Sequence, residues 1–99
     1  MVRKRAISRR WDSAGNVKDE HDALTYLRAC MEKGGHDPTT IAAALGHIAR
    51  ARGMMQLAKD TGLTREGLYK ALSAGGNPSL STVLKVVKAL GLKLTPQAA

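Results

Sequence analysis

The spacing of apolar residues in the first half of the chain predicts two helices. The first covers about residues 20–33, opens on an acidic turn and ends at a pair of glycines. The second runs from Pro38 to just before Gly53, and Asp37 is its N-cap. In both helices apolar side chains recur at three- or four-residue intervals, which predicts one buried face on each. The residues predicted to form these faces are Leu24, Leu27, Met31, Ile41, Leu45 and Ile48.

The second half of the chain predicts three shorter helices. They cover about residues 55–61, residues 65–72, and a segment that begins at Ser81 as N-cap and stops at Gly91. Gly62 can adopt the left-handed conformation that a tight turn between the first two of them requires. The residues predicted to face the core are Leu57, Ala58, Leu63, Leu68, Ala71, Leu72, Val83, Leu84, Val87 and Leu90.

This pattern predicts an all-α fold of five helices in one domain. A length of 99 residues fits a single domain, which we place at residues 16–94. Residues 1–15 are predicted to be a basic N-terminal arm, and residues 95–99 a loose C-terminal tail. Residues 92–94 alternate in polarity as Leu-Lys-Leu, so this segment could form one short strand.

The chain carries a formal net charge of +8, and this charge is concentrated at its two ends. Residues 1–10 contribute +5, residues 11–53 contribute −1, and residues 54–99 contribute +4. An excess of this size makes a polyanion the expected partner. The basic residues of the arm, which would follow a nucleic-acid backbone or simply be solvated, are Arg3, Lys4, Arg5, Arg9 and Arg10.

The composition argues against several other classes of protein. Cys30 is the single cysteine, so no intrachain disulfide and no zinc site with two or more cysteines can form, and a cytoplasmic location is expected. No apolar run reaches the roughly 18 residues of a membrane span. His21, His36 and His47 lie on separate segments, so neither a metal site nor a cofactor is expected. Because no nucleophile–base pattern or phosphate-binding glycine loop is present, the sequence does not indicate an enzyme.

Residues 55–72 have the pattern of a helix-turn-helix. Its parts are a helix, a short turn that contains glycine, and a second helix with a polar outer face. Ala58 is small enough to let the two helices approach closely, and Gly62 permits the sharp turn. An ordinary pair of packed helices would show the same pattern, but the positive charge of this half favours a DNA-binding role.

The outward positions of the second helix in this pair are the candidates for reading DNA bases. Arg65, near the start of the helix, is best placed for a bidentate contact to guanine, worth about 1–3 kcal/mol of discrimination. Glu66 either accepts a hydrogen bond from cytosine or only stabilises the helix dipole. The base-readout candidates are Thr64, which is also the N-cap, Arg65, Glu66, Tyr69 and Lys70. The candidates for contacts to the DNA backbone, which set register, are Gln56, Lys59, Ser73, Asn77, Arg50 and Arg52.

Four segments of the chain also carry a resemblance to a known family. They are ALTYLRAC at 23–30, IAAALGHIARARGM at 41–54, QLAKDTGLTREGLYKALS at 56–73, and GNP with STVLKVVKALGL between 76 and 92. Over about residues 11–94 the chain resembles the addiction-module antidote proteins, a HigA-like antitoxin family with a lambda-repressor/Cro-type helix-turn-helix.

The resemblance implies a fold of about five helices, repression of the protein's own operon, and neutralisation of a RelE/ParE-like toxin encoded beside it. The chain departs from the family in two places. Its first ten residues are more basic than expected, and Met55 stands where a polar residue, often Ser, usually opens the first helix of the motif. The cap of that helix, and any phosphate contact there, are therefore in doubt.

Several functions remain open at this level. A homodimer that reads a palindromic operator in double-stranded DNA is expected, because one recognition helix reads only a few base pairs. A DNA-binding regulator without a toxin, or a basic RNA-associated or architectural protein, would share the charge pattern, although few aromatic residues are present for base stacking. Trp11 and Tyr26 are candidates for a contact outside the core. Trp11 either folds back onto the helices or belongs to a dimer or toxin interface.

Overall fold

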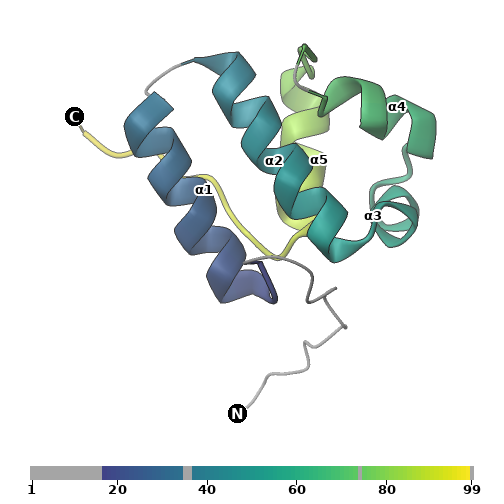
Figure 1. Cartoon of the computed structure of the whole chain (residues 1–99), viewed down its shortest axis with the longest axis horizontal. Coiled ribbons are helices and arrows are strands. Elements are labelled where there is room, and N and C mark those ends of the chain that lie inside the picture. Colours follow the sequence, from purple (N-terminus) through teal and green to yellow (C-terminus); the bar gives the residue numbers. More distant parts are fainter. Residues whose placement is uncertain (1–16, 35–36, 74, 99) are drawn as a thin grey trace.

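Helices form where an apolar stripe is combined with a capping residue. The computed structural model describes residues 17–34, 37–73 and 75–98, and within these ranges it contains five helices (Figure 1). They are α1 (Glu20–Gly34), α2 (Pro38–Arg52), α3 (Met54–Thr61), α4 (Arg65–Ala71) and α5 (Leu80–Ala89). The all-α prediction is therefore confirmed for the described part of the chain, and no helix there has the length and apolar character to cross a membrane.

The start of α2 follows the predicted capping chemistry. The Asp37 carboxylate accepts hydrogen bonds from the backbone N–H of Thr39 at 3.0 Å and from the Thr40 hydroxyl at 3.1 Å, and Pro38 occupies the first helical turn. These hydrogen bonds, the Thr39 backbone bond first, lower the pKa of Asp37 below its usual value. The charged cap is therefore present at neutral pH and is lost only as the pH falls through that lowered pKa.

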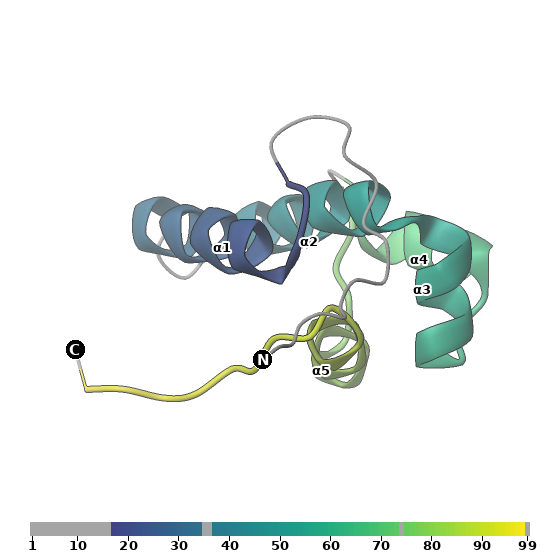
Figure 2. The ribbon, with the colours of Figure 1, turned by 90° about the horizontal axis from the view of Figure 1, so that it is seen from below.

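The core is aliphatic, as the absence of phenylalanine requires. α2 lies between α1 and the α3–α4 pair (Figures 1 and 2) and contributes more buried residues than any other described helix. Val17, just before α1, closes the core from the N-terminal side. The largest fully buried side chains are Leu45, Ile48, Leu57, Leu68, Leu72, Leu90, Val17 and Val86.

Three positions of the core faces predicted for the first two helices lie nearer the surface, and they are Leu24, Met31 and Ile41. Leu24 is 37% exposed, while its neighbour Ala23 is fully buried together with Leu27. Ile41 is only partly buried and packs against the edge of the core. α1 thus presents a narrower apolar stripe to α2 than the sequence pattern predicted.

The predicted N-cap of α5 was wrong by two residues. The helix begins after Ser79, whose hydroxyl accepts a hydrogen bond from the backbone N–H of Thr82 at 3.1 Å. Leu84 was predicted to face the core, yet it is 48% exposed, and Val86 is fully buried instead. The reason is helical spacing, since positions 83, 86, 87 and 90 share one face and position 84 is turned away by about one hundred degrees.

Residues 92–94 do not form the strand that their alternation suggested. The backbone N–H of Leu92 donates to the carbonyl of Val87 at 3.0 Å and so closes the end of α5 around Gly91, which has a φ of 81°. Beyond this point the chain passes α1 (Figures 1 and 2). A strand needs the backbone of a neighbouring strand, and a helix surface offers none.

One close approach between backbones fixes α4 against α2. Gly46, in the middle of α2, is buried, and a Cβ atom at this position would collide with the carbonyl oxygen of Leu72 at the end of α4. Leu72 itself is buried, so the carbonyl cannot move outward without opening the core. The absence of a side chain at residue 46 is therefore a packing requirement.

We expect Gly46→Ala to destabilise the protein by about 1–3 kcal/mol, the usual cost of overpacking. Helix propensity alone predicts the opposite sign, a gain of about 1 kcal/mol, so the direction of the change decides between the two effects. Gly75→Ala is the control, because a Cβ at that glycine meets no atom within 4 Å. Urea denaturation measures both variants, and a more stable Gly46→Ala protein would contradict the close approach.

The assignment of Ser79 as the N-cap of α5 leads to a second prediction. Ser79→Ala removes the hydrogen-bond acceptor for the Thr82 backbone N–H and should cost about 1 kcal/mol. Ser81→Ala, at the position first predicted as the cap, should change the stability by less than about 0.5 kcal/mol. Thermal unfolding followed by circular dichroism compares the two proteins, and equal losses would show that neither serine acts as a specific cap.

Candidate nucleic-acid interface

The turn between α3 and α4 is built by three successive residues. Gly62 ends α3 in the left-handed conformation, with a φ of 77°, and its backbone N–H donates to the carbonyl of Ala58 at 2.9 Å. Leu63 is partly buried against the core, and its N–H donates to the hydroxyl of Thr61 at 3.2 Å. Thr64 then caps α4, as the sequence predicted. Its hydroxyl accepts from the backbone N–H of Gly67 at 2.9 Å.

α4 is held to the core by one side and exposes the other. Leu68 is fully buried, and Leu72 follows it as the C-cap. All five base-readout candidates lie on the exposed side, and four of them line a shallow hollow at the start of the helix. These four are Thr64, Arg65, Glu66 and Tyr69. Lys70, also exposed, follows them on the same short helix. The structure thus brings the five candidates together.

The candidates for the DNA backbone are more scattered. Lys59, Arg50 and Asn77 have exposed side chains. Gln56 is exposed, but its amide Nε2 donates to Asp60 at 2.9 Å. The Ser73 hydroxyl donates to the carbonyl of Lys70 at 3.0 Å. For these last two, a bond to a phosphate would have to replace a bond within the protein.

Arg52 is the one described backbone candidate that lies in the interior. Its side chain is only 5% exposed and its guanidinium Nη2 lies 3.5 Å from Oδ2 of Asp60. The ion pair joins the last turn of α2 to α3, and Asp60 also receives the bond from Gln56. The sequence analysis predicted that Arg50 and Arg52 both contact the DNA backbone. However, two residues along a helix are separated by a rotation of about two hundred degrees, so their side chains leave the helix on different sides. We therefore leave Arg52 out of the interface.

The first turn of α3 also departs from the usual pattern. α3 begins at Met54, one residue earlier than predicted, and its N-cap Gly53 offers no side-chain hydrogen bond. Met55 is 62% exposed in this turn. The structure thus agrees with the sequence analysis, which questioned whether a side chain caps this helix.

Tyr26 was predicted to make a contact outside the core, but in the structure it packs between helices. It is partly buried against the core, and its ring packs on that of His47 with 4.9 Å between the ring centroids. Burial and, secondly, a hydrogen bond with Cys30 raise the pKa of Tyr26 above its usual value, so the phenol is neutral at physiological pH. Tyr26 is therefore a contact between α1 and α2, which the sequence spacing did not reveal.

Several sequence predictions fall on residues outside the described ranges. They concern Trp11, His36 and the five basic residues of the arm, Arg3, Lys4, Arg5, Arg9 and Arg10.

Comparison with known proteins gives a family. The sequence matches the family model described as "probable addiction module antidote protein" over residues 7–98. It is 46% identical over 87 residues to an uncharacterized protein of Haemophilus influenzae, and the match covers 88% of each chain. No solved structure matches this chain. Since the family model covers nearly the whole sequence, this chain belongs to the family of probable addiction module antidote proteins.

Proposed function

We propose that this protein is the antitoxin of a type II toxin–antitoxin module and represses its own operon by binding DNA through α3 and α4. Membership of the antidote family implies a toxin partner. The DNA-binding part of this proposal is supported by the exposure of α4. This short helix buries Leu68 and exposes polar side chains from Thr64 to Lys70. In this proposal, the five helices form a lambda-repressor-like helix-turn-helix domain.

In this proposal α4 enters the major groove of double-stranded DNA, which is about 12 Å wide. Arg65 has the exposure and the planar donor fork that a bidentate bond to guanine requires. Glu66 beside it accepts from cytosine or stabilises the positive end of the helix. Tyr69 is 45% exposed, so its hydroxyl is able to reach a phosphate.

Contacts to the phosphates hold the helix in register. Lys59, Arg50 and Asn77 are exposed for this purpose, and Gln56 and Ser73 join them if they exchange their internal hydrogen bonds for phosphate oxygens. The basic arm adds further contacts along the backbone. The net charge of +4 over residues 54–99 adds to the attraction between the protein and DNA.

The partners in this proposal are the protein's own operator, a RelE/ParE-like toxin and a second copy of the chain in the cytoplasm. The protein acts by binding and not by catalysis. Two copies read a palindromic operator with half-sites about one helical turn apart. A regulator without a toxin is the alternative, and a toxin gene in the neighbouring reading frame distinguishes the two.

Arg65→Ala should abolish the preference for the operator and leave binding to random DNA nearly unchanged. A lost bidentate contact to guanine costs about 1–3 kcal/mol on the correct site only. Arg65→Lys should also lose most of the preference, because an ammonium group lacks the planar donor fork. Fluorescence anisotropy with operator and scrambled duplexes measures both affinities.

Lys88→Ala is the matched control for this experiment, because it removes one exposed positive charge from α5 and leaves α4 unchanged. It should leave the ratio of the two affinities unchanged. If Arg65→Ala weakens binding to operator and scrambled DNA equally, Arg65 contacts the backbone and does not read a base.

Deletion of residues 1–10 tests the arm separately. Loss of five basic residues should weaken binding to every sequence and reduce the slope of log affinity against log salt by about 0.9 for each lost phosphate contact. A salt titration of the full-length and shortened proteins on the same duplexes gives the slopes. An unchanged slope would mean that the arm does not touch DNA.

A further inference from the structure

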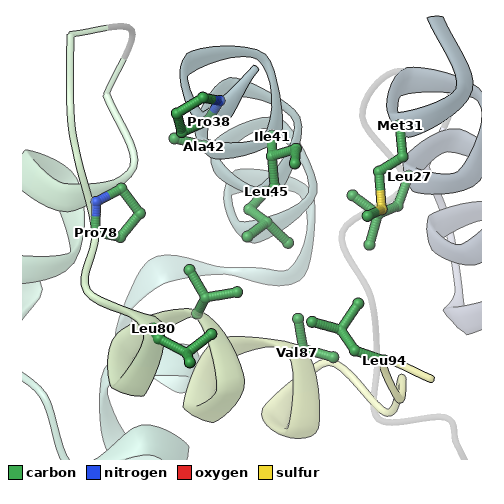
Figure 3. Close-up of a pocket in the computed structure, with 11 residues that line it drawn as sticks. Leu27, Met31, Pro38, Ile41, Ala42, Leu45, Pro78, Leu80, Val87 and Leu94 are labelled. Carbon is green, nitrogen blue, oxygen red and sulfur yellow. The ribbon is translucent and has the colours of Figure 1, made fainter. Parts of the chain in front are cut away.

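An apolar cavity of about 240 Å³ lies between α1, α2 and α5 (Figure 3). Every residue that lines it is apolar, and none carries a charge. Figure 3 shows that Leu27, Met31 and Leu94 gather at one end of this space, and that Pro78 and Leu80 lie at the other end. The cavity thus extends from the segment that follows α5 to the loop that precedes it. It shares no residue with the hollow at the start of α4.

One end of this cavity is continuous with a second hollow of different chemistry. Leu27, Met31 and Leu94 line both spaces, so the two are joined along α1. The second hollow lies between α1 and the segment after α5, and charged and polar side chains form half of its lining. A binding site for an amphipathic small molecule combines these two parts, because the apolar part supplies affinity and a few polar groups fix the orientation of the ligand.

The charges around the second hollow favour an anion. Two cations, Arg28 and Lys93, line it together with one carboxylate, Glu32. Arg28 and Lys93 are exposed, and within the described residues neither is paired with a carboxylate. α5, which forms one wall of the apolar cavity, also exposes Lys85 and Lys88. The positive excess attracts a ligand that carries a negative charge at one end.

We propose that the two spaces together bind a straight-chain carboxylate, a fatty acid of about eight to ten carbons. The size follows from the volume, because an apolar cavity of about 150 Å³ holds the six carbons of benzene, and 240 Å³ therefore holds about ten. The tail occupies the apolar cavity. The carboxylate lies in the second hollow and accepts charge-assisted hydrogen bonds from Arg28 and Lys93. This site is independent of the proposed function of α4.

The first test varies the length of the tail. Isothermal titration calorimetry of the full chain without DNA compares butyrate, hexanoate, octanoate, decanoate and dodecanoate, each below its micelle concentration. Every CH₂ group that enters the cavity should tighten binding about fourfold. Octanoate should bind with a dissociation constant of about 1 mM or tighter. The gain should vanish between decanoate and dodecanoate, because the cavity is then full.

Methyl NMR spectra locate the tail. Octanoate should shift the methyl signals of Met31 and Ile41, which line the cavity, and leave the signals of Leu68 in α4 unchanged. Val83→Phe adds volume at a partly buried residue of the lining and should abolish these shifts. Circular dichroism checks that this variant keeps its helices.

Variants of the two exposed cations test the position of the carboxylate without disturbing the core. Arg28→Gln and Lys93→Gln should each weaken octanoate binding about threefold, and the double variant about tenfold, as expected for exposed ion pairs. Binding of octanol, which has the same tail and no charge, should not change. Lys33→Gln is the matched control, because Lys33 is exposed on α1 and lines neither space. It should bind octanoate as tightly as the native chain.

Three results would overturn the proposal. The first is a flat length series, or no methyl shift at about 5 mM octanoate. The second is octanoate affinity that is unchanged in the double variant of Arg28 and Lys93, since the carboxylate would then lie elsewhere. The third is a native dimer that octanoate separates into monomers in sedimentation equilibrium, since a second copy would then occupy the cavity. Failure of the Arg65 variants to alter DNA binding would count against the proposed function and leave this site standing.

Discussion

The contact between Gly46 and the carbonyl of Leu72 is the constraint on which the candidate interface depends. α4 has seven residues and buries one of them, so its own packing is too small to fix its orientation. The close approach of the α2 backbone at Gly46 supplies the missing restraint, and buried Leu68 and Leu72 complete it. Because α2 contributes more buried residues than any other described helix, α4 is attached to the element at the centre of the core.

α3 is attached to the same helix by a different interaction. Arg52, nearly buried at the end of α2, pairs with Asp60 in α3, which also accepts a hydrogen bond from Gln56. The Arg52 side chain is buried and that of Asp60 is partly exposed, so this pair ties the end of α2 to the surface of α3. α3 and α4 are therefore both positioned by α2, and the left-handed Gly62 sets the angle between them.

The two surfaces of the molecule have opposite chemistry. The start of α4 exposes charged and hydroxyl groups, while the groove between α1, α2 and α5 is wholly apolar. Under the proposed function the chain binds several partners at once, and surfaces that share no residue allow DNA and a second ligand to bind together. Charge is also divided unevenly along the chain, since residues 11–53 carry a net charge of −1 and residues 54–99 carry +4.

The sequence by itself determined the five helices of the described residues, the caps of α2 and α4, and the exposed polar positions of α4. These features rest on local chemistry, such as the Asp37 and Thr64 caps and the glycine turn, and local chemistry is visible in a short stretch of residues. Only the tertiary structure decided that Arg52 turns inward to Asp60, that Leu84 stays outside, and that residues 92–94 form no strand. Helical spacing separates Arg52 from Arg50 and Leu84 from Val86, but which face of each helix is covered depends on the distant element that packs against it, and the local sequence does not encode that neighbour.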